Sequence, residues 1–195
     1  MRERLVRESE FDYNVLRSNE QWDDHRLRTI VTASTIAWLK PQTVLDPAGG
    51  DGSILAKADL MYDINRIIFG DISSKNCEYV KQYGWETHCD DVDDTLEDHD
   101  SSGIDVIVLS EILEHLENPD RTLQLAANAG HKLVASSPCM REGQYDDNPE
   151  HLWMFDAEGY QTMLETNGWN IIQDTRLKFL TTYDFQIYVC ERALD

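Results

Sequence analysis

The sequence predicts an α/β protein with a doubly wound, mostly parallel sheet of seven strands whose last strand is antiparallel. Short apolar runs alternate along the chain with segments of helical periodicity, which is the order that βαβ units produce. A glycine-rich turn at residues 47–52 follows the first apolar run and leads into a segment compatible with a helix. Two late strands follow each other without a helix between them, which predicts a final antiparallel hairpin.

The individual elements follow from the spacing of apolar residues and from residues that begin or end helices. Asn118 and Pro119 are typical of a helix start, and Gly130 of its end. The predicted strands cover residues 44–46, 66–70, 85–88, 104–109, 132–135, 171–172 and 185–189, and the predicted helices about 19–39, 54–58, 74–83, 119–130 and the region of 160–164. The first of these helices is predicted to be amphipathic from residues at helical spacing: Leu27, Ile30, Val31, Ala37 and Trp38.

Length and composition favour one ordinary domain over residues 1–195, with residues 1–40 as an N-terminal helical segment that contributes to a lid over a pocket. The N-terminus is charged and no stretch approaches the ~20 apolar residues that a membrane span needs, so we expect a soluble, cytoplasmic protein. The widely spaced Cys77, Cys89, Cys139 and Cys190 form no Cys-x-x-Cys pair and predict reduced thiols rather than a disulfide framework.

The formal net charge of −20 disfavours a mainly electrostatic grip on DNA or RNA. It predicts a solvated acidic surface, suited to high salt, with residues 90–94 and 97–100 partly in an exposed loop.

Acidic residues follow three of the predicted strands. Asp46, Asp71 and one of the adjacent Asp90 and Asp91, of which we take Asp91, would meet along one edge of the sheet. Asp71 lies about 20 to 25 residues beyond the start of the glycine turn, as suits the hydroxyls of a ribose. A carboxylate such as Asp46 disfavours a pyrophosphate and favours a cationic sulfonium ligand. The pocket therefore predicts a nucleoside ligand without phosphates, although single acids at strand ends also serve as helix caps.

With these residues the chain resembles the class I S-adenosylmethionine-dependent methyltransferases, which have a Rossmann-like fold, over roughly residues 25–190. The resemblance depends on residues 44–52, on 70–73 and most specifically on 105–119, which is similar to the small-molecule and ubiquinone-pathway type. It implies that Asp46 and the glycine turn hold the methionine portion of S-adenosylmethionine, Asp71 the ribose and Asp91–Val92 the adenine. The cofactor-binding set that it implies is Asp46, Ala48, Gly49, Gly50, Gly52, Asp71, Ile72, Asp91, Val92 and Ser110.

Candidate catalytic groups follow the strand at 104–109. Glu111, Glu114 and His115 are spaced i, i+3, i+4, so a helix starting there would set all three on one face. With His151 they could hold Mg²⁺, as in metal-dependent O-methyltransferases that have similar groups, or His115, His151 and Glu111 could act as catalytic residues without a metal. Acids in a first helical turn also favour the helix dipole without any ligand.

Other nearby residues are assigned more ordinary places. Trp153 and Phe155 are predicted as core residues rather than substrate stackers, and His25 and Arg28 as part of a solvated helix face that could otherwise contact the cofactor carboxylate.

The sequence thus predicts methyl transfer to an oxygen or nitrogen of a small molecule by a monomer or homodimer. The acceptor pocket would come from residues 1–25 and 139–155. Double-stranded DNA is disfavoured as acceptor, because Ser110–Leu113 replace the Asp/Asn-Pro-Pro-aromatic motif of DNA-base enzymes. The alternatives are an Mg²⁺-dependent RNA-end or nucleotide 2′-O-methyltransferase that uses Glu111, Glu114, His115 and His151, and a non-catalytic partner subunit that binds the cofactor.

Overall fold

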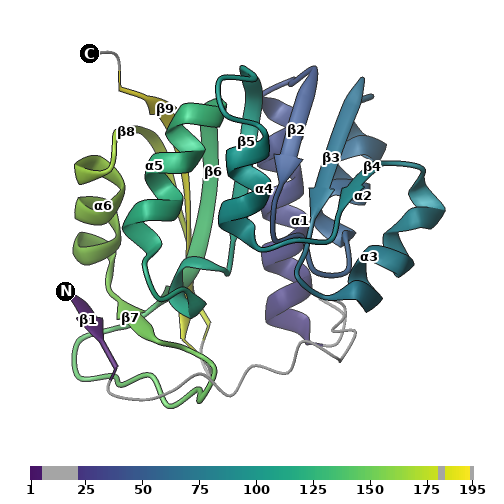
Figure 1. Ribbon diagram of the computed structural model, residues 1–195. Helices are drawn as coiled ribbons and strands as arrows, with labels where there is room; N and C mark the ends of the chain where they lie inside the picture. The colour runs from purple at the N-terminus through teal and green to yellow at the C-terminus, as the bar shows by residue number, and fades with distance from the viewer. Residues whose placement is uncertain (6–21, 180–182, 194–195) are drawn as a thin grey trace.

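The computed structural model describes residues 1–5, 22–179 and 183–193. A seven-stranded sheet in the order β4-β3-β2-β5-β6-β9-β8 forms its centre (Figure 1). The strands of this sheet are β2 (Thr43–Asp46), β3 (Arg66–Gly70), β4 (Glu86–His88), β5 (Ile104–Ser110), β6 (Gly130–Cys139), β8 (Trp169–Leu177) and β9 (Asp184–Arg192). The helices are α1 (Asp23–Trp38), α2 (Ser53–Met61), α3 (Ser74–Val80), α4 (Val92–Asp98), α5 (Pro119–Ala129) and α6 (Ala157–Thr166), with 3₁₀ turns η1 (Lys81–Tyr83) and η2 (Leu113–His115).

The topology confirms the predicted fold class. Strands β2 to β6 pair in parallel, and β9 runs antiparallel to both of its neighbours, β6 and β8. Strand order reverses between β2, which continues outward to β3 and β4, and β5, which continues to β6. Such a reversal opens a crevice at the carboxyl ends of the strands, where ligands of doubly wound proteins bind.

Helices cover both faces of the sheet. Apolar side chains of α1, α2 and α3 pack on one face, and those of α4, α5 and α6 on the other; Figure 1 shows α5 and α6 on the near side and α1 on the far side. The largest fully buried side chain is Trp169 of β8, whose indole Nε1 donates to the Leu123 carbonyl of α5 at 3.0 Å. Both faces of the parallel strands are therefore buried, which explains their nearly continuous apolar runs.

The described helix α1 begins at Asp23, and its buried face differs from the predicted one. Leu27, Ile30 and Trp38 are 44%, 44% and 66% exposed. The residues that face the sheet and α2 are mostly small: Thr29, Thr32, Ala33 and Ile36. Small side chains allow the helix to approach its neighbours closely, and apolar periodicity alone could not reveal this face.

The acidic residues after β4 are predicted to lie partly in an exposed loop, and in the structure helix α4 forms the centre of this stretch while Asp90, Asp91 and Asp100 are exposed on either side of it. The Asp91 side chain accepts a hydrogen bond from the backbone of Asp93 at 2.9 Å and so caps the helix. Acidic residues in the first turn complement the helix dipole, and the buried Val92, Thr95 and Leu96 anchor the helix to the core.

The N-terminal segment forms a small ribbon with a later part of the chain. Strand β1 (Arg2–Arg4) pairs antiparallel with β7 (Trp153–Phe155). Residues 6–21 of the predicted lid segment 1–40 lie outside the described residues. Phe155 is buried in the core as predicted, whereas the half-buried Trp153 ring has the Arg2 guanidinium 4.5 Å from its centroid.

The prediction of four reduced thiols is wrong for two of them. Cys77 of α3 and Cys89, directly after β4, form a disulfide, while Cys139 and Cys190 are free and buried. The packing of α3 beside β4 brings residues 12 apart in sequence to a Cα–Cα distance of 6.0 Å. In the described part of the chain, no helix has the length and apolar character needed to cross a bilayer.

Candidate functional site

A cavity of about 220 Å³ lies at the carboxyl ends of β2, β3, β4 and β5. Asp46, Asp71 and Asp91, each placed after or at the end of a strand, all line it. The structure thus brings the three acids together, and it is Asp91, not the adjacent Asp90, that lines the cavity. The other predicted cofactor residues that line the cavity are Ala48, Gly49, Gly50, Ile72, Val92 and Ser110.

The glycine turn is shaped by close contacts. A Cβ on Gly49 would lie 2.5 Å from the Phe69 ring of β3, and Gly50 has φ +60°, which favours glycine. Gly52 is not among the lining residues: its φ is +72° and a Cβ there would lie 2.9 Å from Val80. The absence of a side chain on Gly52 lets α2 begin close against α3, and contact of Gly52 with the cofactor stays a prediction.

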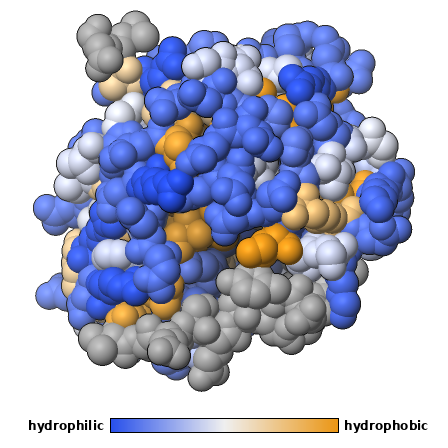
Figure 2. All heavy atoms as spheres, in the orientation of Figure 1, coloured by the Kyte–Doolittle hydropathy of each residue, from blue (hydrophilic) through white to orange (hydrophobic). Residues whose placement is uncertain are grey.

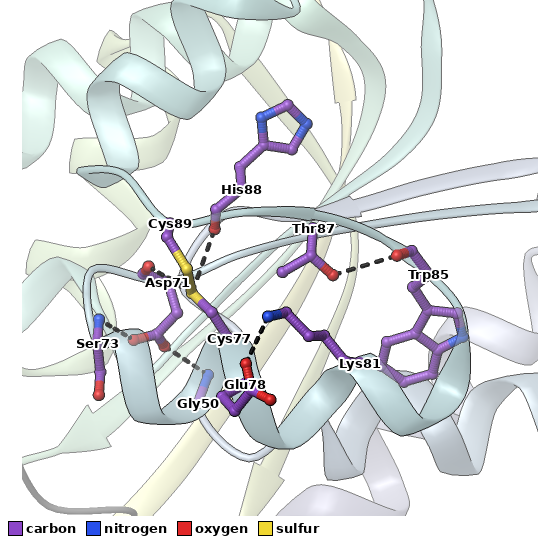
Figure 3. Close-up of a disulfide and its surroundings, with 10 residues drawn as sticks. All are labelled: Gly50, Asp71, Ser73, Cys77, Glu78, Lys81, Trp85, Thr87, His88 and Cys89. Atoms are coloured by element: carbon purple, nitrogen blue, oxygen red, sulfur yellow. Dashed lines mark hydrogen bonds and ion pairs between the residues drawn. A yellow bond between two sulfur atoms is a disulfide. The ribbon is translucent and has the colours of Figure 1, made fainter.

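Asp71 fastens two loops of the cavity wall. Its Oδ2 accepts from the backbone N–H of Gly50 at 2.9 Å, and its Oδ1 accepts from that of Ser73 at 2.8 Å (Figure 3). Burial raises the pKa of this carboxyl, while the two backbone donors oppose the shift. The disulfide lies immediately behind this arrangement and joins α3, which follows the Asp71 loop, to the residue before Asp90 and Asp91.

Asp46 is the most deeply buried of the three acids, with 2% of its surface exposed. Its Oδ1 accepts from the backbone N–H of Ala48 at 3.3 Å. Burial is the largest effect and raises its pKa to about 7, with a further upward contribution from Asp71. A cation in the cavity would stabilise the ionised form of this carboxyl.

Arg28 lies in the cavity wall rather than on the predicted solvated face. It is 3% exposed, its Nη1 donates to Ser110 Oγ at 2.9 Å, and it lies 3.9 Å from Glu111 Oε1. Glu111 also accepts from Ser136 Oγ at 2.8 Å. The structure thus overturns the solvated face for Arg28, and contact of Arg28 with the cofactor carboxylate stays a prediction.

The predicted helix after β5 does not form. Glu111 has φ +56°, and only a 3₁₀ turn, η2, follows it. The loop backbone bonds to other elements instead: Glu111 N donates to Ser136 O at 3.0 Å, and Leu152 N donates to Glu114 O at 2.7 Å. A non-glycine residue held in the left-handed region is a feature that concentrates at functional sites.

Three of the four candidate catalytic or metal-ligating side chains still meet. One ligand atom each from Glu114, His115 and His151 lie within 4.8 Å of one another, and the two imidazoles are 4.7 Å apart between centroids. Glu111 does not belong to this group. His115 lines the cavity, whereas Glu114 and His151 lie behind it and are almost fully buried.

A further acid, Asp146, completes this region and was not predicted. Its Oδ2 lies 2.7 Å from His151 Nδ1, and both residues are buried. Neither carboxylate oxygen of Glu114 has a hydrogen-bond partner within the described residues, and burial, followed by the nearby Glu111, raises its pKa well above the usual value. Two imidazoles and one carboxyl are not the oxygen-rich set that Mg²⁺ requires, so the predicted Mg²⁺ site does not fit these residues.

Sequence and structure comparisons place the chain among known proteins. A family model described as a methyltransferase domain matches residues 18–174. A comparison with curated proteins finds no significant sequence match.

The chain is similar in structure to the [4+2]-cyclase SpnF (14% identity, 98% of this chain and 88% of that one, TM-score 0.73). It is also similar to a structure of a Haloferax volcanii complex between the Trm112 methyltransferase activator and a putative methyltransferase (14% identity, 90% and 96% covered, TM-score 0.71). A third similar structure is magnesium protoporphyrin IX methyltransferase from Synechocystis PCC 6803 with bound S-adenosylmethionine (17% identity, 93% and 88% covered, TM-score 0.65).

These similar structures, at 14–17% identity, show the fold alone, and one of them is a cyclase. The family model covers most of the chain, including the glycine turn, the three acids and the β5 loop. The chain belongs to the methyltransferase-domain family and has the Rossmann-like fold of the S-adenosylmethionine-dependent class I methyltransferases.

Proposed function

We propose that this protein transfers the methyl group of S-adenosylmethionine to an oxygen or nitrogen of a small molecule. The observation that carries the proposal is the convergence of Asp46, Asp71 and Asp91 from neighbouring strand ends on one cavity beside the Gly49–Gly50 turn. Acids at these positions suit a ligand with a positive centre and hydroxyl groups, and repel a pyrophosphate.

Each wall of the cavity has a part in holding the donor. Asp46 and the glycine turn would contact the methionine portion, Asp71 with Ile72 the ribose, and Asp91 with Val92 the adenine. The Arg28 guanidinium, buried at the methionine end beside Ser110, is suited to the carboxylate of the amino acid portion. Asp71 would act with its carboxylate already oriented by two backbone N–H groups, so little ordering remains to be done on binding.

S-adenosylmethionine supplies an activated methyl group, so the protein chiefly aligns the acceptor and takes its proton. His115 is placed for the second task. Its Nδ1 lies 2.9 Å from the Glu150 carbonyl oxygen, which can only accept a hydrogen bond. Nδ1 therefore carries the proton of the neutral ring, and the lone pair that can receive the acceptor's proton is on Nε2.

His151 and Asp146 support this base from behind. The Asp146 carboxylate orients the His151 ring through Nδ1, and the edge of one imidazole faces the plane of the other at 79°. We assign His115 as the base and His151 as a positioning residue whose ring is oriented by Asp146.

Calorimetry with S-adenosylmethionine and S-adenosylhomocysteine tests the donor site. Both ligands should bind at one site, and a phosphorylated dinucleotide should not. Asp71→Ala should weaken binding at least tenfold, because it removes a charged acceptor and loosens two loops. Wild-type affinity for the donor in that variant, or preferential binding of the dinucleotide, would contradict the proposed site.

Product formation tests the reaction itself. S-adenosylhomocysteine should accumulate when the protein is given the donor and a panel of phenols, amines and carboxylic acids, and EDTA should leave the rate unchanged. Loss of the rate with EDTA and its return with Mg²⁺, but not with Zn²⁺, would favour the metal-dependent alternative. Donor binding without turnover of any acceptor, with RNA ends added to the panel, would favour a non-catalytic subunit.

A further inference from the structure

A second cluster of metal-ligating side chains lies at the outer edge of the sheet. Glu86 and His88 are the first and last residues of the edge strand β4, and His99 caps the C-terminal end of α4. None of the three lines the cavity described above. In Figure 3 the His88 ring points away from the disulfide.

The three side chains surround one point. His88 Nε2 is 3.4 Å and His99 Nε2 is 4.0 Å from the same oxygen, Glu86 Oε1, and one ligand atom from each residue lies within 4.8 Å of the others. A tetrahedral Zn²⁺ ion with bonds of about 2.0–2.1 Å separates its ligand atoms by roughly 3.3–3.4 Å. The cluster is therefore slightly wider than a closed zinc site, and it is too wide for a hydrogen bond between His99 and Glu86.

His99 carries the second observation. This residue is 7% exposed, and its Nε2 is buried without a hydrogen-bond partner among the described residues. Buried nitrogen atoms of this kind are rare because the lost hydration is costly. The ring faces His88 edge to plane at 5.1 Å between centroids, so its uncompensated nitrogen is directed into the cluster. Burial, and then His88, lower the pKa of His99, which favours the neutral form that binds metals.

The carboxylate of the cluster is already held in place. The Arg66 guanidinium of β3 donates to both oxygens of Glu86, with Nη2 at 2.8 Å from Oε2 and 3.1 Å from Oε1. Hydrogen bonds behind a ligating carboxylate are usual at metal sites, where they orient the ligand and offset its charge. Oε1 faces the two imidazoles, while the shorter Arg66 contact is with Oε2.

We propose that Glu86, His88 and His99 form a binding site for a divalent transition-metal ion, with Zn²⁺ as the best match. Two imidazoles and one carboxylate are a donor set that Zn²⁺ accepts, with water in the remaining position. The ion would join β4 to the far end of α4 and so brace the intervening segment, which includes Asp91. The site is independent of the proposed methyl donor.

Zinc binding is tested by equilibrium dialysis of the full chain against Zn²⁺ without thiols, followed by metal analysis and thermal unfolding. We expect the wild type to bind one equivalent of Zn²⁺ at this site, and His99→Asn and the more exposed His88→Asn to lose that equivalent. His131→Asn, an exposed histidine outside both clusters, serves as the matched control and should keep it. At a hundredfold excess of Zn²⁺ over its dissociation constant, Tm of the wild type should rise by about 5–10 °C.

The other histidine cluster is separated by a further variant. His115→Asn removes a ligand from the cavity-side group and should leave the equivalent at β4 in place. Zinc binding that survives in His99→Asn and His88→Asn but disappears in His115→Asn would assign the ion to the cavity side and overturn the proposal. Failure of the wild type to retain Zn²⁺ would do the same. If His99→Asn does not fold, His88→Asn alone decides.

Discussion

Replacement of Asp46 by Asn should make the ligand-free protein more stable at alkaline pH while weakening donor binding. Asp46 is almost completely buried, and burial raises its pKa from 3.8 to about 7. The folded state therefore favours the protonated carboxyl, so this group's contribution to stability is fully present below pH 3.8 and is lost as the pH rises to about 7. Asn keeps the size of the side chain and an oxygen that can accept from Ala48, and it carries no charge at any pH.

The magnitude follows from the two pKa values. Between pH 5 and pH 8 the stability that wild type loses through Asp46 alone is about 3 kcal/mol, obtained with a pKa of 3.8 for the unfolded state and about 7 for the folded state. The free-energy difference between Asp46→Asn and wild type should grow by that amount over the same range. The other acids of the cavity region, such as Glu111 and Glu114, are present in both proteins, so the comparison isolates the effect of position 46.

Urea unfolding of the ligand-free proteins at pH 5, 6, 7 and 8 measures this difference, with Asp100→Asn, an exposed acid, as the control that should show no such trend. Calorimetry on the same samples should show S-adenosylmethionine binding weakened about 10- to 100-fold by Asp46→Asn at pH 8, since a charged contact is lost. A free-energy difference that stays constant from pH 5 to pH 8 would refute the assigned burial of charge. Unchanged affinity would refute the contact with the donor.

Three further outcomes follow from local contacts. Gly49→Ala should lower both Tm and donor affinity, because its Cβ would lie 2.5 Å from the Phe69 ring behind the turn. Gly130→Ala is the control: its Cβ would lie equally close to Ile107 outside the cavity, so thermal unfolding should show a lower Tm and calorimetry an unchanged donor affinity. Asp146→Asn should reduce kcat about 10²- to 10⁴-fold and alter the pH–rate profile with donor affinity intact, because His151 loses its charged partner, and an unchanged profile would argue against this pairing. Trp169→Ala should cost about 3–5 kcal/mol in urea unfolding through loss of a fully buried ring, and a cost below 1 kcal/mol would show that this end of the core is loosely packed.

Much of the fold could be predicted because its strands are buried on both faces and its connections are short. The runs at 66–70 and 104–109 match β3 and β5 closely, since nearly every residue in them packs against a helix. The acids at the strand ends could also be placed, because parallel strands deliver their carboxyl ends to one edge. Placing these acids at one edge requires only the order of strands and helices, which the sequence pattern indicates directly.

The wrong predictions around the site share a physical origin: contacts with distant parts of the chain outweigh the local preferences of the sequence. Glu111 and Glu114 have helical spacing, but backbone groups of their loop bond to Ser136 and Leu152, so a helix gains nothing there. Arg28 reaches the site because α1 packs against the sheet, and Asp146 reaches it because the loop before β7 packs against the β5 loop. Contacts between segments so distant in sequence leave no local pattern, and only the burial of these polar side chains in the folded protein indicates them.

The cross-link between Cys77 and Cys89 has a practical consequence for every titration outlined above. It links α3, which follows the Asp71 loop, to the residue before the wall that carries Asp91. Opening it with dithiothreitol or a phosphine leaves the β3–β4 pairing and the bond from Asp71 N to His88 O to hold these two sides of the cavity together. Affinities measured on samples prepared with and without such additives describe two different molecules. Thiol content, counted with a chromogenic reagent on the unfolded chain, belongs beside each dissociation constant.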